Sequence, residues 1–245
     1  MLSLCIPCVN MFCSYIRLLA SIFSLWLVHA SPLDISKSKI LYTKVEAVRR
    51  FREASKAKTT NGYAKVPNCF AQMTQPEGTD YLIIPSVSSE RRRYVPIGFL
   101  NADTISSNAV QIVPGATLYH FGVLTSNVHM AWMRTVCGRL KSDYRYSKEI
   151  VYNTFPWCNP TPVQQAAIEK TAQAILDARA LYPDCSLAVL YDETTMPNEL
   201  RAAHQYNDRA VMRAYGFYVD GKSMTESACV AELMKLYQAK TAETK

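Results

Sequence analysis

Short apolar runs separated by polar turns fill the middle of the chain, from about residue 81 to residue 155. The run Tyr81–Ile84 is apolar throughout and is closed by Pro85, which is typical of a buried strand. A Ser-Ser-Glu turn follows at residues 88–90. Further strands are predicted over residues 93–99, 109–113, 144–146 and 150–155.

Apolar residues at helical spacing lie in and around this region. Residues 44–58 carry Val45, Val48 and Phe51 at helical spacing opposite Arg and Lys side chains, which predicts a basic amphipathic helix. Further helices are predicted over residues 117–124, 128–137, 162–181, 200–215 and 225–238.

Together these elements predict an α+β fold in three segments. Residues 1–43 form an atypical apolar N-terminus and linker. Residues 44–155 form a domain built on a mixed sheet, and residues 156–245 form a small helical domain. Pro156, Pro160 and Pro162 mark the boundary between these two domains.

Basic residues are concentrated in the first of these domains. Residues 37–149 hold 17 Lys/Arg and 8 Asp/Glu, a balance of +9, whereas residues 156–245 hold 9 and 11, a balance of −2. A local positive excess suggests a polyanionic partner such as DNA, because phosphates attract it. On charge alone, a solvated basic face without a partner is an equal alternative.

Motifs of common enzyme sites are missing from the sequence. The 8 glycines include no GxG pair, and no HExxH or GxSxG motif occurs. Of the 8 cysteines, only Cys5 and Cys8 form a CxxC, with no second pair to complete a zinc site. We expect no metal and reduced thiols, as in a cytoplasmic protein.

Three consecutive arginines are the strongest candidate for contact with DNA. Arg91, Arg92 and Arg93 follow the Ser-rich turn and enter the strand predicted over residues 93–99. Strand alternation would place Arg91 and Arg93 on one face and Arg92 on the other. Two guanidinium groups on one face can hold phosphates or read guanine. The alternative is that they pair with Glu90 or Asp80 and only brace the sheet.

A basic loop rich in tyrosine is the second candidate. Lys141, Asp143, Arg145 and Lys148 surround Tyr144 and Tyr146. Arg and Lys suit guanine, and Asp suits the amino group of cytosine. The alternative places both tyrosines in the core and leaves the charged residues on a solvated edge.

Ser126 and Asn127 are a third, weaker candidate. Their side chains favour a helix cap, and a helix N-terminus can face a phosphate. An ordinary structural cap is the alternative.

Three long segments resemble the C-terminal part of MmeI-like DNA methyltransferases. They are PSVSSERRRYVPIGFL, TLYHFGVLTSNVHMAWMRTVCGRLKSDYRYSKEIVYNTFPW and YDETTMPNELRAAHQYNDRAVMRAYGF, and the resemblance extends from about Trp26 to Gln238. It implies that the first two belong to a target-recognition domain and the third to a helical C-terminal domain. The family methylates adenine in restriction–modification systems and uses S-adenosylmethionine.

The chain departs from that family in what it lacks. The S-adenosylmethionine-binding glycine motif and the Asn-Pro-Pro-aromatic catalytic motif are both missing, so activity does not carry over. The resemblance implies a DNA-recognition module that binds double-stranded DNA without its catalytic domain. Two alternatives are a specificity subunit that methylates DNA only with a separate methyltransferase chain, and a non-functional gene fragment.

The first thirty residues leave several interpretations open. An apolar run over residues 18–28 precedes Val28-His29-Ala30, which is similar to a secretory cleavage site. The positive segment that should precede the run is missing, and the run is short for a membrane span. Because Trp26 already belongs to the family resemblance, we favour a truncated or re-started reading frame and expect no membrane anchoring.

Overall fold

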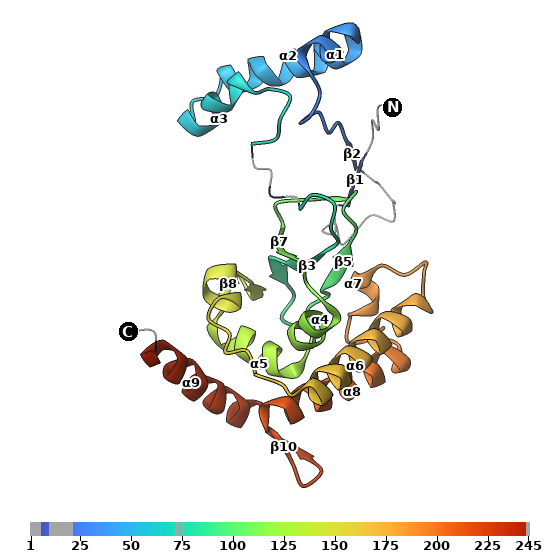
Figure 1. Ribbon diagram of the computed structural model, residues 1–245, viewed down its shortest axis with the longest axis vertical. Helices are drawn as coiled ribbons and strands as arrows, with labels where there is room; N and C mark the ends of the chain where they lie inside the picture. Colours follow the sequence, from blue (N-terminus) through green and yellow to red (C-terminus); the bar gives the residue numbers. More distant parts are fainter. Residues whose placement is uncertain (1–5, 10–21, 72–73, 75, 244–245) are drawn as a thin grey trace. The chain divides into compact units, whose positions relative to one another are not determined.

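A computed structural model describes residues 6–9, 22–71, 74 and 76–243 of the chain (Figure 1). Residues 18–21 of the apolar run considered above as a signal segment lie outside these residues. The chain forms two compact units, the first mainly from residues 22–78 with 102–105, and the second from residues 79–101 and 106–243.

The first unit is helical with a small sheet. Ser31 and Ser38 cap its first two helices through their hydroxyl groups, as expected from N-cap preferences. Its elements are β1 (Ile6–Val9), β2 (Ile22–Ser24), α1 (Pro32–Lys37), α2 (Lys39–Glu53), α3 (Lys58–Gly62), the 3₁₀ turn η1 (Tyr63–Lys65) and β6 (Ile105–Ser106), with sheet order β2-β1-β6.

The basic helix begins and ends earlier than the sequence predicts, at 39–53 instead of 44–58. Of its three predicted core residues only Val45 is buried, packed with Leu27 and Ile35, while Phe51 is 74% exposed. Near the end of α2, Arg52 donates to three carbonyl oxygens of the following segment, those of Tyr63, Val66 and Cys69.

Two small sheets organise the second unit. Strand β3 (Tyr81–Pro85) lies between β5 (Gly98–Leu100) and β7 (Val110–Pro114) and pairs with both in antiparallel fashion. A second antiparallel sheet has the order β4 (Val87–Ser88), β9 (Asp143–Arg145), β8 (Gly138–Leu140). All five residues of β3 are buried, as the uninterrupted apolar run predicts.

Helices enclose these sheets. They are α4 (Leu118–Leu124), α5 (Asn127–Val136), α6 (Pro162–Ala180), α7 (Leu187–Leu190), α8 (Asn198–Tyr215) and α9 (Glu226–Glu243), with a hairpin of β10 (Tyr218–Val219) and β11 (Lys222–Ser223) between the last two. The long helices α6 and α8 run side by side, and α4 packs against α6 (Figure 1). The predicted α+β class is confirmed.

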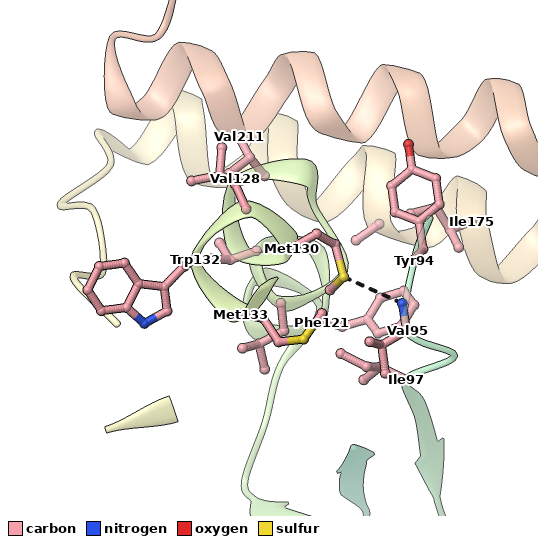
Figure 2. Close-up of a cluster of buried hydrophobic side chains, with 14 of the residues drawn as sticks. Tyr94, Val95, Ile97, Phe121, Val128, Met130, Trp132, Met133, Ile175 and Val211 are labelled. Atoms are coloured by element: carbon pink, nitrogen blue, oxygen red, sulfur yellow. Dashed lines mark hydrogen bonds between the residues drawn. The ribbon is translucent and has the colours of Figure 1, made fainter. Parts of the chain in front are cut away.

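One continuous core joins the strands to the C-terminal helices. Figure 2 shows side chains of α4 and α5 packed against Val95 and Ile97, with Ile175 and Val211 contributed by α6 and α8. The sulfur of Met130 accepts a hydrogen bond from the backbone N–H of Val95 at 3.5 Å. The helices after residue 160 are therefore part of the packing that supports the earlier segment.

Two of the predicted strands are wrong. Only residues 98 and 99 of the predicted 93–99 strand are in the sheet, because β5 begins at Gly98. The four residues Tyr94–Ile97 are all buried, without the alternation of a half-exposed strand, and Pro96 has no N–H to donate. Residues 148–152 form a π-helical turn instead of a strand, capped by the Ser147 hydroxyl. This turn directs Val151 and Phe155 into the core.

Candidate nucleic-acid interface

The three arginines lie on a turn that leaves the sheet, and not on a strand. The N–H of Arg92 donates to the carbonyl of Ser89 at 3.1 Å, closing the turn directly after β4. The predicted strand alternation of Arg91 and Arg93 is therefore wrong. Both of these residues are nevertheless exposed, and Arg92 is half-buried.

The turn that carries Arg91, Arg92 and Arg93 is here called the arginine turn. Its guanidinium groups are available to a ligand. No ion pair involves Arg91, Arg92 or Arg93 in the part of the chain that the structure describes. The alternative of a bracing pair with Glu90 or Asp80 thus finds no support there. The Arg93 guanidinium carbon lies 5.6 Å from the centre of the Tyr94 ring, a cation–π contact, and the Arg93 charge also acts on the Tyr94 hydroxyl and on Asp208.

The basic loop is the tip of the hairpin formed by β8 and β9, which are joined by a two-residue loop, Lys141 and Ser142. Lys141 adopts a positive φ of 57° at this tip, which is uncommon for a residue other than glycine. Arg139 holds the tip by donating to the carbonyl of Ser142 at 2.8 Å. Its guanidinium also stacks over the Tyr144 ring, 4.0 Å from the ring centre. These two contacts of Arg139 hold the hairpin tip in place.

Alternation along β9 separates its core residues from its polar ones. Tyr144 and Tyr146 are 8% and 3% exposed, and the Tyr146 hydroxyl lies 3.0 Å from Nε2 of the buried His129. The interpretation of both tyrosines as core residues is confirmed, so neither presents its ring to a base. Asp143 and Arg145 share the opposite face, where Arg145 is exposed and Asp143 half-exposed.

The arginine turn and the hairpin tip line a common hollow, here called the loop groove. It has a volume of about 360 Å³ and is lined by Ser89, Glu90, Arg91, Arg92, Ser142, Asp143, Asp192 and Glu193. Pairing of β4 with β9 brings the two segments together, because Ser88 lies opposite Tyr144. Hydrogen bonds from Thr194 lower the pKa of Asp192, and Arg92 and Arg91 contribute further, so this carboxylate stays charged beside them.

A second hollow, the arginine groove, shares the arginine turn with the loop groove. Its volume is about 790 Å³. The arginine turn forms one wall, and residues of α5, α8, hairpin β10–β11 and α9 form the rest. Its lining includes Asn127, Arg134, Gln205, Asp208, Arg209, Met212, Tyr218, Gly221, Ser223 and Glu226.

A buried carboxylate lies at the base of the arginine groove. Asp208 accepts a hydrogen bond from the Tyr94 hydroxyl at 2.7 Å and another from the Asn127 N–H at 2.8 Å. Burial raises the pKa of this carboxyl to about 6, although both hydrogen bonds act in the opposite direction. These contacts fix the start of α5 and the end of the arginine turn to helix α8.

Six of the predicted site residues do not line the loop groove: Arg93, Ser126, Asn127, Lys141, Arg145 and Lys148. Ser126 is fully buried, and its hydroxyl donates to Val123 O at 2.7 Å and caps α5 at His129 N. Direct contact of Ser126 with a phosphate is therefore corrected to an ordinary cap. Because Asp208 already occupies the Asn127 N–H, the α5 N-terminus is not open to an anion at that N–H. Lys148 is exposed beside Glu149, 3.7 Å away.

Several residues of these surfaces escape prediction from the sequence. Arg139 lies two residues before Lys141 in the same hairpin. This closeness in the sequence could have identified it as part of the basic loop. Asp192, Glu193 and Arg209 carry no such signal, because they reach the arginine turn only through packing of segments about a hundred residues apart in the chain.

Among the described residues, no group of three or more His, Cys, Asp or Glu side chains is arranged to hold a metal ion. Within the same residues, no helix combines the length and apolar character needed to cross a membrane.

Comparison with known proteins identifies both parts of the chain. A family model described as "MmeI, target recognition domain" matches residues 20–159, and one described as "MmeI, C-terminal domain" matches residues 160–244. DNA methyltransferase A of Bacillus subtilis (strain 168) is 38% identical over 220 residues, covering 89% of this chain and 24% of that protein.

A solved structure is also similar to this chain over most of its length. The Type IIL restriction-modification enzyme MmeI in complex with DNA matches with a TM-score of 0.84 and 47% sequence identity, over 90% of this chain and 29% of that chain. The chain therefore spans between about a quarter and a third of the length of these relatives.

Proposed function

The chain belongs to the MmeI family, with the target recognition domain at residues 20–159 and the C-terminal domain at residues 160–244, and on this premise we propose that it recognises specific sequences in double-stranded DNA. It would serve as the recognition module of an adenine-specific restriction–modification methyltransferase. The observation that carries the proposal is the loop groove, where the exposed Arg91 and the half-buried Arg92 lie beside a braced hairpin tip.

The two segments have different roles in this proposal. Arg91, Arg92 and Arg93 contact phosphates and set the register of the module on the duplex. Lys141, Asp143 and Arg145 read base edges, since the hairpin that carries them is narrow enough to enter the major groove. The helices of the C-terminal domain brace this surface through the shared core.

Methyl transfer itself is assigned to another part of the system. Methyltransferases of this kind take the methyl group from S-adenosylmethionine, and the residues of this chain bind the DNA and orient it. One candidate arrangement is a separate methyltransferase chain that methylates DNA only together with this one. A cytoplasmic location, where the proposed DNA partner would be met, is part of this proposal.

The test is the salt dependence of binding to duplex DNA. The double substitution Arg91→Ala and Arg93→Ala removes two cations, so the slope of log affinity against log salt should become shallower by about 1.8, at about 0.9 per phosphate contact. Affinity should fall for all sequences alike. Lys170→Ala, which removes an exposed cation of α6, is the matched control. An unchanged slope in the double variant refutes the role of the arginine turn.

The two-chain arrangement has its own test. Co-purification of a methyltransferase polypeptide, and methylation of DNA only when both chains are present, support it. Duplex binding by this chain together with failure to stimulate any methylation by the co-expressed polypeptide argues against it. Aggregation of this chain when expressed alone favours the interpretation as a gene fragment.

A further inference from the structure

Helix α8 presents one polar face to the arginine groove. Gln205, Asp208, Arg209 and Met212 all line it, and their spacing of three and four residues places them along one side of the helix. This face lies opposite the arginine turn. The arginine groove is thus bounded by the target recognition domain on one wall and by the C-terminal domain on the other.

Two contacts hold the side chain of Arg209 in place without neutralising its charge. Its Nε donates to the carbonyl of Gln205 at 3.1 Å, and its guanidinium carbon lies 4.7 Å from the centre of the Tyr206 ring. No ion pair engages it among the residues that the structure describes. A guanidinium fixed through Nε keeps its terminal N–H groups for a ligand and loses little conformational entropy on binding.

Most carboxylates that line the arginine groove are already engaged. Glu226 accepts two hydrogen bonds from Arg134, at 2.8 and 3.1 Å. Glu193 pairs with Arg201 at 2.8 Å, and Asp208 accepts from Tyr94 and Asn127. The remaining carboxylate of this lining is that of Glu90. Four guanidinium groups of the lining form no ion pair among the described residues, so the surface favours an anion; they are those of Arg91, Arg92, Arg93 and Arg209.

A short stiff hairpin completes the second wall. Asp220 and Gly221 form its two-residue loop with φ of 50° and 76°, the left-handed conformation that tight hairpins need. Arg213 stacks on Tyr218 with its guanidinium carbon 4.5 Å from the ring centre. Tyr218, Gly221 and Ser223 line the arginine groove, and Figure 1 shows the hairpin projecting from the end of α8.

We propose that the C-terminal domain contacts DNA directly: one phosphodiester backbone lies along the arginine groove, with Arg209 of α8 bound to a phosphate opposite the arginine turn. The inference rests on the proposed function and extends it. The C-terminal domain then acts as a clamp on the backbone in addition to its bracing role. Arg209 positions the duplex and carries no base specificity.

The experiment measures binding of the full chain to a mixed-sequence duplex of about 30 base pairs across a salt series. Arg209→Gln should make the salt slope shallower by about 0.9, which reduces the loss of affinity between 50 and 200 mM salt by about threefold. Arg209→Lys should keep the wild-type slope because it keeps the charge. Lys170→Gln on α6 is the control, and melting curves confirm that each variant is folded.

Three outcomes distinguish failure of this inference from failure of the proposed function. A shallower slope for Arg209→Gln, restored by Arg209→Lys, supports it. A slope for Arg209→Gln equal to that of the Lys170→Gln control overturns it, while a shallower slope for the double variant of Arg91 and Arg93 leaves the proposed function standing. Failure of the wild-type chain to bind duplex DNA overturns both.

Discussion

Replacement of Gly122 by alanine tests how tightly the two domains are packed. Gly122 lies on α4, where an added Cβ atom would lie 2.7 Å from Cγ2 of Ile168 and 3.2 Å from Cβ of Ala172, both on α6. The Gly122 carbonyl also accepts a hydrogen bond from Nδ2 of the buried Asn207 at 2.7 Å. The methyl group therefore has no space unless α4 and α6 move apart.

The expected loss of stability is the balance of one favourable and two unfavourable effects. Alanine is favoured over glycine inside a helix by about 1 kcal/mol. Overpacking of a filled core costs about 1–3 kcal/mol, and weakening the buried bond from Asn207 costs about 1–3 kcal/mol more. We expect Gly122→Ala to lower the free energy of unfolding by about 2 kcal/mol.

Urea denaturation followed by circular dichroism and tryptophan fluorescence measures this change. The control is Gly138→Ala, since a Cβ at Gly138 meets only Arg145 Cβ at an ordinary 3.9 Å. Combining Gly122→Ala with Ile168→Ala should cost less than the sum of the two single changes, because the second removes the atom that the new methyl group meets. Unchanged or increased stability of Gly122→Ala would show that α4 and α6 are not in close contact.

Three further predictions concern the binding surface. Lys141→Ala or Arg145→Ala should relax the sequence preference in selection from a random duplex library more than overall affinity; a uniform loss across sequences would make these residues phosphate contacts instead. The carboxyl of Asp208 has a pKa raised to about 6 in the folded protein, so its contribution to stability is present below about pH 4 and is lost as pH rises through 6. The difference in unfolding free energy between wild type and Asp208→Asn should change by about 2 kcal/mol between pH 4 and pH 7, and a constant difference would contradict the raised pKa. Arg139→Ala should speed amide exchange in the β8–β9 hairpin, because the stacking on Tyr144 is lost, while exchange in α6 serves as the unaffected reference.

Much of the local structure follows from the sequence because its causes are local. The apolar run ending at Pro85 gives β3, and Thr125 ends α4 while Ser126 caps α5. The long helix α6 starts at Thr161-Pro162 with a capping box that includes Gln164. The family resemblance is confirmed as well, since it rests on long uninterrupted segments.

The errors arise where burial overrides local pattern. Residues 93–99 have strand-like composition, but Tyr94 donates to Asp208 and Val95 to Met130, so the segment packs against helices instead of joining a sheet. Residues 148–152 contain β-branched and aromatic residues, yet Ser147 caps a helical turn there. Propensity is a weak guide when tertiary contacts compete with it.

The sequence by itself determines the elements, the basic character of residues 37–149 and the membership of the family. Tertiary structure alone decides that the arginine turn lies beside the tip of the β8–β9 hairpin, and that Asp192 and Arg209 complete the surfaces around it. The physical reason is distance along the chain: β4 pairs with β9 across more than fifty residues, and α8 meets the arginine turn through the Tyr94–Asp208 bond. Such contacts form only when the whole core has closed, and no spacing of residues encodes them.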